Sequence, residues 1–448
     1  MATKKIFSIT GKEVPNQEPS QSSDEKIAET SFVPRFSYWN GLHVFSILGG
    51  CALAMSALTL IPRHNSILYQ KYWYEMIFPI GFARFIWAAV KVLELGVLVG
   101  KDKLVSIGLH LKIFFTSFLI HVTLFCFVYL FTTRIQGHNH PQPHVYTICF
   151  MPTQIIGIFS TPFLLPRKHF EEEDFKQKMK MFILYELCWF MASFTKIFLA
   201  TMFTKLEHTD AQCIIALLIL ISKRGTAFVI SKVIHRLFGA ENERANVLVA
   251  VSISVNYGFF AATKIAGARF ATVFCMVALE ILIQLKMSHQ IFKLHKKVHV
   301  YGNETINSDK KKALLRLVLA ELCEGLIHLA YIIGFVMAYY GPNSKLIGNV
   351  GNGDWHYEAV DDVSHTFRVM FGLFAMDLVS LSLNSAIVWM KSNVNIVQEF
   401  CYVLKKYWPV LVLKLTYHMY SYFLSNDVNN GYDMTFKFSW LTKNETSI

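Results

Sequence analysis

The amino-acid sequence predicts an all-α integral membrane protein, a polytopic bundle of about ten transmembrane helices in a lipid bilayer. Of its 448 residues, 53% are hydrophobic and only 17% are charged, which is too apolar for an ordinary soluble domain. Ten apolar windows are each long enough to cross a hydrocarbon core of about 30 Å. The segments between these windows alternate between rich and poor in lysine and arginine, as the positive-inside rule requires.

The windows divide the chain into a polar start, a membrane bundle and a C-terminal segment. Residues 1–40 lack the apolar stretch of a signal peptide, so we expect a disordered cytosolic tail there. The transmembrane bundle is expected over residues 41–392. The sixth window has few apolar residues before Lys223 and Arg224, which predicts a broken or tilted helix. In chain order, the windows are Leu42–Ile61, Met76–Val99, Leu104–Phe131, Tyr146–Leu165, Met181–Thr204, Ala211–Phe238, Ala245–Thr263, Arg269–Leu285, Ala313–Tyr340 and Phe367–Met390.

Basic residues set the orientation of the chain. The segment after the eighth window is strongly basic, so we expect this segment and the N-terminus to lie in the cytosol. The protein itself is expected in the plasma membrane or an endomembrane. Asn303 begins a glycosylation sequon in this segment and should therefore carry no glycan. The net charge of +12 follows this loop pattern, which argues against nucleic-acid binding. The basic residues are Lys286, Lys293, Lys296, Lys297, Lys310, Lys311, Lys312 and Arg316.

The segment over residues 393–425 has two alternative predictions. Its apolar and aromatic stretch Ile396–Leu424 contains Pro409 and several lysines, among them Lys414. This mixture favours an amphipathic helix lying in the cytosolic interface, where lysine side chains reach the headgroups. An eleventh crossing is the alternative.

The polar tail over residues 426–448 ends in a sequence that resembles the ligands of PDZ domains. Such domains add a free C-terminus as a strand and capture its carboxylate and last side chain. Ile448 would fill the apolar pocket, Thr446 would supply a hydroxyl, and Glu445 would add a charged contact. A cytosolic PDZ protein is therefore an expected partner. A sequon at Asn444 competes with this prediction, because glycans are added only in the lumen.

Charged residues inside the apolar windows are the candidate functional residues, because a charge in hydrocarbon is costly without a partner or water. Glu321, Glu324 and His328 share one helix face and are the strongest candidates. They favour a transporter or channel for a small solute or ion, with a proton or cation relay. A receptor or scaffold with purely structural ion pairs is the alternative. The predicted path consists of Glu321, Glu324, His328, Glu186, Lys196, Arg84, Lys91, Glu94 and Arg224.

Metal and enzyme chemistry receive less support from the sequence. Two carboxylates and an imidazole could ligate a metal, but the Glu-x-x-His spacing of di-iron bundles is missing, so no metal and no cofactor are expected. The histidines His138, His140 and His144 fit an exposed loop. Phosphate-loop, H-E-x-x-H and G-x-S-x-G motifs are absent from the sequence. A membrane-embedded enzyme such as an acyltransferase, using His121 or His328, stays open as a third alternative.

Overall fold

The structure is a computed structural model, and it is entirely helical in the part of the chain that it describes. Both ends of the chain, with the PDZ-like tail and Asn444, lie outside the described residues, as do His138, His140 and Asn303. His144 is expected in the same loop as His138 and His140, but it lies in the first turn of a helix that begins at Pro143, so the loop prediction is wrong for this residue. The described residues are 38–59, 74–99, 106–136, 143–166, 173–205, 209–238, 243–265, 270–301, 304–340 and 363–429.

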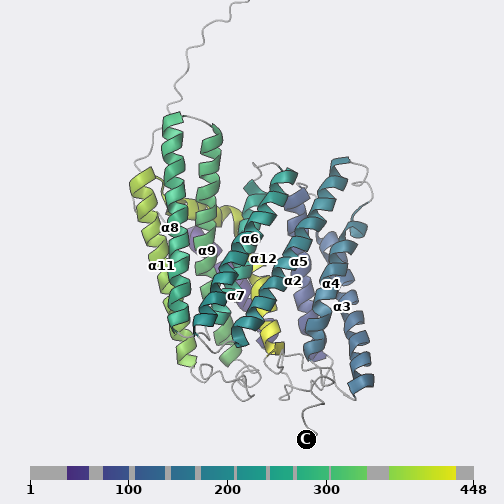
Figure 1. Cartoon of the computed structure of the whole chain (residues 1–448). Coiled ribbons are helices and arrows are strands. Elements are labelled where there is room, and N and C mark those ends of the chain that lie inside the picture. Colours follow the sequence, from purple (N-terminus) through teal and green to yellow (C-terminus); the bar gives the residue numbers. More distant parts are fainter. Residues whose placement is uncertain are drawn as a thin grey trace, which may run out of the picture. The chain divides into compact units, whose positions relative to one another are not determined.

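Each of the ten predicted windows coincides with a helix, and an eleventh helix follows them (Figure 1). The all-α prediction is therefore confirmed for the described residues. The helices are α1 (Tyr38–Thr59), α2 (Tyr74–Val99), α3 (Ile107–Gln136), α4 (Pro143–Leu164), α5 (Glu173–Lys205), α6 (Thr209–Phe238), α7 (Glu243–Ile265), α8 (Phe270–Tyr301), α9 (Glu304–Tyr340), α11 (Val363–Ser392) and α12 (Ile396–Asn429).

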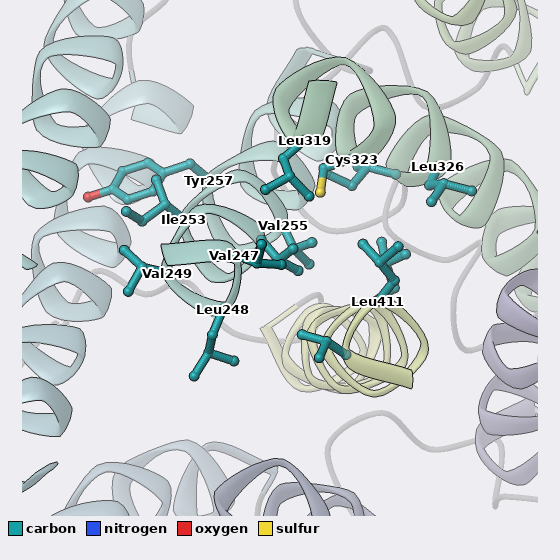
Figure 2. Packing of buried hydrophobic residues seen from close by; sticks show 14 of the residues in the cluster. Val247, Leu248, Val249, Ile253, Val255, Tyr257, Leu319, Cys323, Leu326 and Leu411 are labelled. Carbon is teal, nitrogen blue, oxygen red and sulfur yellow. The ribbon is translucent and has the colours of Figure 1, made fainter. Parts of the chain in front are cut away.

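Helix α9 lies at the centre of the packing. Its apolar window is 72% buried, and it contacts α1, α7, α8, α11 and α12. Figure 2 shows Leu319, Cys323 and Leu326 of α9 beside apolar side chains of α7 and Leu411 of α12. These side chains are almost completely buried, so burial of apolar area fixes α7, α9 and α12 against one another.

Peripheral helices leave an apolar face uncovered. Along α3, Ile107, Phe115, Leu119 and Phe127 are each more than 60% exposed and recur at roughly helical spacing. An uncovered apolar stripe of this length would favour aggregation in water, whereas it suits hydrocarbon. Among the described residues, five helices contain segments that are long and apolar enough to cross a membrane, which is consistent with a membrane protein: Ile107–Val128, Asp210–Ile234, Thr272–Val300, Ile306–Met337 and Phe367–Ser392.

Helix α6 corrects one expectation. The sequence predicts a broken or tilted helix around Lys223. The structure has an unbroken helix of 30 residues, so the predicted break is wrong, while the tilt stays a prediction. Lys223 does not interrupt the helix because its ammonium group finds carboxylate partners on neighbouring helices. A lysine inside an apolar window therefore marks a contact here and not a helix end.

A tight turn leads from α11 into α12. Asn393 has a φ of 52°, a left-handed conformation that asparagine tolerates, and its N–H donates to the carbonyl of Trp389 over 2.9 Å. The side-chain oxygen of Asn395 then accepts the N–H of Val397 over 3.0 Å and caps the new helix. α12 extends from this turn, contains Pro409, and packs against α1, α2, α7 and α9.

Candidate functional site

Buried charged side chains gather in two separate groups on different helices. The first group, which we call the balanced cluster, consists of Lys91 and Glu94 of α2, Glu186 of α5 and Lys414 of α12. The second group, the acidic cluster, brings together residues of α6, α8, α9 and α11. Its charged or titratable members are Lys223, Glu280, Glu321, Glu324, His328 and Asp377.

The balanced cluster joins three helices through direct ion pairs. The Nζ atom of Lys91 lies 2.7 Å from Oε2 of Glu94, one helical turn away, and 2.5 Å from Oε2 of Glu186. Lys414 donates to Oε1 of Glu94, which also accepts a hydrogen bond from the Tyr185 hydroxyl over 3.4 Å. None of the four charged side chains is more than 10% exposed. Two ammonium groups face two carboxylates, so the formal charges cancel without any bound ion.

Arg84 and His121 form a second buried contact beside the balanced cluster. The guanidinium Nε and Nη2 atoms of Arg84 lie 3.0 Å and 2.6 Å from Nδ1 of His121. Arginine can only donate, so Nδ1 of His121 accepts and the imidazole is neutral with its proton on Nε2. The side chains are 1% and 0% exposed, respectively. His121 therefore holds α3 against α2. It is not among the residues that line the cavity of the acidic cluster, which is described below.

One part of the acidic cluster surrounds Lys223. Its Nζ atom lies 2.9 Å from Oε1 of Glu280 on α8 and 3.3 Å from Oε1 of Glu324 on α9. The second oxygen of Glu324 accepts a hydrogen bond of 2.7 Å from the amide of Gln284. A single lysine is thus shared by two carboxylates that approach from different helices.

The other part lies between α9 and α11. Glu321 accepts hydrogen bonds from Asn384 over 2.7 Å and from Ser380 over 3.4 Å. Ser380 also donates to the side-chain oxygen of Gln284, and Ser288 donates to Asn384 over 2.7 Å. These contacts join the two parts of the acidic cluster into one hydrogen-bonded chain across α6, α8, α9 and α11.

His328 and Asp377 complete the acidic cluster. Nδ1 of His328 lies 2.5 Å from Oδ2 of Asp377, and the side chains are 12% and 18% exposed. This pair belongs to the same cavity wall as Glu280 and Glu324.

A cavity of about 60 Å³ lies inside the acidic cluster. One buried water molecule needs roughly 10–15 Å³ of such volume, so the space can hold about four waters or a small hydrated ion. Apolar side chains of α6, α7 and α9 close the rest of the wall, including Ile219, Tyr257 and Ile327. The titratable groups in the wall are Lys223, Glu280, Glu324, His328 and Asp377.

The structure divides the residues that the sequence assigns to one path. Glu321, Glu324 and His328 lie together in the acidic cluster. Lys91, Glu94 and Glu186 lie in the balanced cluster, and Arg84 lies against His121. The side chain of Arg224 is exposed on α6, on a different face from Lys223. Lys196 lies on α5, and its side chain is outside the described part of the structure.

Several members of the two clusters are not among the path residues that the sequence predicts. Lys414 is absent because its helix is expected at the membrane surface. Glu280, Asp377 and Lys223 are visible as charges within apolar windows but lack a local pattern that singles them out. Gln284, Ser288, Ser380 and Asn384 could have been found, because polar residues recur at intervals of three or four along α8 and α11, as they do at Glu321, Glu324 and His328.

Metal ligation finds no support among the residues that the structure describes, which include no group of three His, Cys, Asp or Glu side chains placed to hold an ion in that way. Comparisons with protein-family models, curated proteins and solved structures give no match for this chain. Function is therefore argued from the geometry of the clusters.

Proposed function

We propose that the chain is a multi-pass membrane protein that binds a small cation or a proton at the acidic cluster and moves it across the bilayer. The observation that supports this most directly is an excess of carboxyl groups around a cavity halfway along apolar helices. Glu321, Glu324 and His328 lie near the middle of the apolar part of α9, and Asp377 lies near the middle of α11.

Charge counting supports a cationic ligand. Four carboxyl groups of the acidic cluster face one ammonium group and one imidazole. Even with the imidazole protonated, full ionisation leaves two negative charges without a counter-charge from the cluster. Uncompensated charge in a low-dielectric interior costs several kcal/mol, so bound protons or a cation must supply the balance.

Cavity size limits the class of ligand. Sites for drug-sized molecules occupy about 300–1,000 Å³, whereas this cavity offers about 60 Å³. A proton or an inorganic monovalent cation with a few waters fits that space. Gln284 and Ser380 add neutral oxygen atoms to the residues that line the cavity, and oxygen ligands are those that hard cations prefer.

A receptor or scaffold is the second candidate, and the balanced cluster favours it. Four paired charges, none of which lines the cavity of the acidic cluster, need no ligand and act as a clamp between helices. Transport therefore depends on the acidic cluster alone. The proposed orientation places the N-terminus, the basic end of α8 and the basic beginning of α9 in the cytosol.

The test is cation and proton flux in liposomes that contain the purified protein. Sodium and potassium gradients are applied separately, and proton movement is followed with a pH-sensitive dye. Glu324→Gln keeps the shape of the side chain and removes its charge, so we expect flux to fall by about tenfold or more. Arg224→Gln is the matched control, since its exposed side chain should leave flux unchanged. Equal flux in wild type, Glu324→Gln and Glu280→Gln would exclude the acidic cluster as the path.

A further inference from the structure

We infer that α12 is an eleventh membrane crossing that carries the C-terminus to the side opposite the basic end of α8 and the basic beginning of α9, which makes Asn444 an N-glycosylation site. The inference rests on the proposed membrane location, but its main step, the direction of α12 within the bundle, depends only on helix contacts.

Contacts with α1 show that the two helices run in the same direction. The ring of His43 lies 5.8 Å from that of Trp408. Further along both helices, a methyl group placed on Gly50 would lie 3.1 Å from Val412, and the sulfur of Cys51 lies 3.9 Å from the hydroxyl of Thr416. Residue numbers on α1 and α12 rise together.

Contacts with α2 have the opposite order. Lys414 binds Glu94, whereas Tyr420 has its ring 5.0 Å from that of Phe82, farther toward the beginning of α2. Residue numbers on α2 therefore fall as those on α12 rise. A helix that lay across the end of the bundle could not follow both neighbours in this way, so α12 runs along α1 and against α2.

The first part of α12 lies at the end where α7 begins. Glu243, the first residue of α7, accepts hydrogen bonds from Lys406 over 3.0 Å and from Tyr407 over 2.7 Å. From Tyr407 to Asn429 the helix rises roughly 33 Å at 1.5 Å per residue. That length is sufficient for a hydrocarbon core of about 30 Å.

Lys414 explains why the lysines of α12 are compatible with a crossing. Its side chain is 5% exposed and bound to Glu94, so it does not extend toward headgroups as an interfacial lysine would. Lys406 lies eight residues earlier in the helix, near the end of the bundle, and its side chain is 38% exposed. Only one lysine of the segment is therefore deep, and that lysine has its counter-charge.

The two sequons consequently belong to opposite ends of the bundle. α7, α8 and α9 follow one another through short connections, so α9 begins at the same end as α7 and α12. Asn303 lies in the connection between Tyr301 and Glu304, at that end, whereas α12 ends at the other. The basic residues assign the first end to the cytosol, so Asn444 follows α12 on the lumenal side. A glycan at Asn444 and a cytosolic PDZ partner exclude each other.

The experiment expresses the full chain in eukaryotic cells with an epitope after Ile448. We expect peptide N-glycosidase to increase the gel mobility of wild type and Asn303→Gln but not of Asn444→Gln. In sealed microsomes, the epitope should survive added protease until detergent is present. Digestion of the epitope in sealed microsomes, with Asn303 unglycosylated, overturns the eleventh crossing, and a protected epitope without a glycan on Asn444 overturns the modification site.

One outcome separates this inference from the proposed function. A glycan on Asn303 together with a digested C-terminal epitope would keep α12 as a crossing and reverse the orientation of the bundle, which overturns the Asn444 site. Extraction of the protein from membranes by alkaline carbonate would instead contradict the proposed membrane location itself.

Discussion

The balanced cluster and the acidic cluster are built from the same kinds of residue, yet their charges add up differently. In the balanced cluster, Lys91 and Lys414 face Glu94 and Glu186, and the groups are packed against one another. In the acidic cluster, Lys223 is shared between Glu280 and Glu324, while further carboxyl groups line the same cavity or adjoin it.

The difference separates two uses of charge inside an apolar bundle. Where buried charges cancel, removing one group exposes the desolvation penalty of its partner. Where acids are in excess around a cavity, removing one acid relieves repulsion and removes a ligand. Net charge and free volume, more than the presence of charge, therefore distinguish a structural clamp from a binding site.

The largest expected effect comes from breaking the balanced cluster. Lys91→Met leaves Glu94 and Glu186 with only Lys414, and losing one partner of a buried pair costs about 3–5 kcal/mol. We expect a large fall in the thermal unfolding midpoint of the purified protein in detergent, followed by tryptophan fluorescence. Adding Glu186→Gln restores the balance and should recover much of the loss. A single variant as stable as wild type would contradict the clamp.

Cation binding at the acidic cluster should give the next largest effect. A ligand at a hundred times its Kd stabilises the folded protein by about 2.7 kcal/mol. We expect sodium or potassium, compared with a bulky organic cation at equal ionic strength, to raise the unfolding midpoint of wild type. Glu324→Gln should abolish this rise. A rise of the same size in the variant would show that the cation binds elsewhere.

The helices were predictable because a window of apolar residues is a local property. All ten windows coincide with helices, and the face shared by Glu321, Glu324 and His328 follows directly from helical spacing. The pairing of the charges was not predictable, because Lys223 of α6 meets Glu324 of α9 only after both helices have packed against α7 and α8. The depth of Lys414 in the bundle was not predictable either. A lysine among aromatic residues gives the same sequence pattern whether its side chain contacts lipid headgroups or a buried carboxylate.

Glycine substitutions test the difference in packing between the two regions. A methyl group at Gly157 would lie 2.8 Å from Cη2 of Trp87, a rigid ring beside Lys91. At Gly258 it would meet the flexible end of Ile327, which borders the cavity. We expect Gly157→Ala to cost about 1–3 kcal/mol and Gly258→Ala clearly less. Unfolding midpoints of the two variants in detergent provide the comparison, and Gly325→Ala, with open space around it, is the control. Equal losses at Gly157 and Gly258 would contradict the looser packing around the cavity.

Arg224 should give the smallest effect. Its side chain is exposed, so Arg224→Gln is expected to change the free energy of unfolding by no more than about 0.5 kcal/mol. Cation-dependent stabilisation should also stay as in wild type. If Arg224→Gln abolished the cation-dependent rise in the unfolding midpoint, Arg224 would belong to the transport path that the sequence predicts. Part of the binding site would then lie outside the cavity.

The central claim is tested most directly by the same carboxyl-to-amide change in both clusters. Unfolding midpoints of Glu94→Gln and Glu324→Gln are measured side by side in a buffer without small inorganic cations. We predict that Glu94→Gln is strongly destabilised, because Lys414 loses its partner, while Glu324→Gln is as stable as wild type or more stable, because repulsion among the acids falls. Equal destabilisation of the two variants would contradict the distinction between a structural clamp and a cation site.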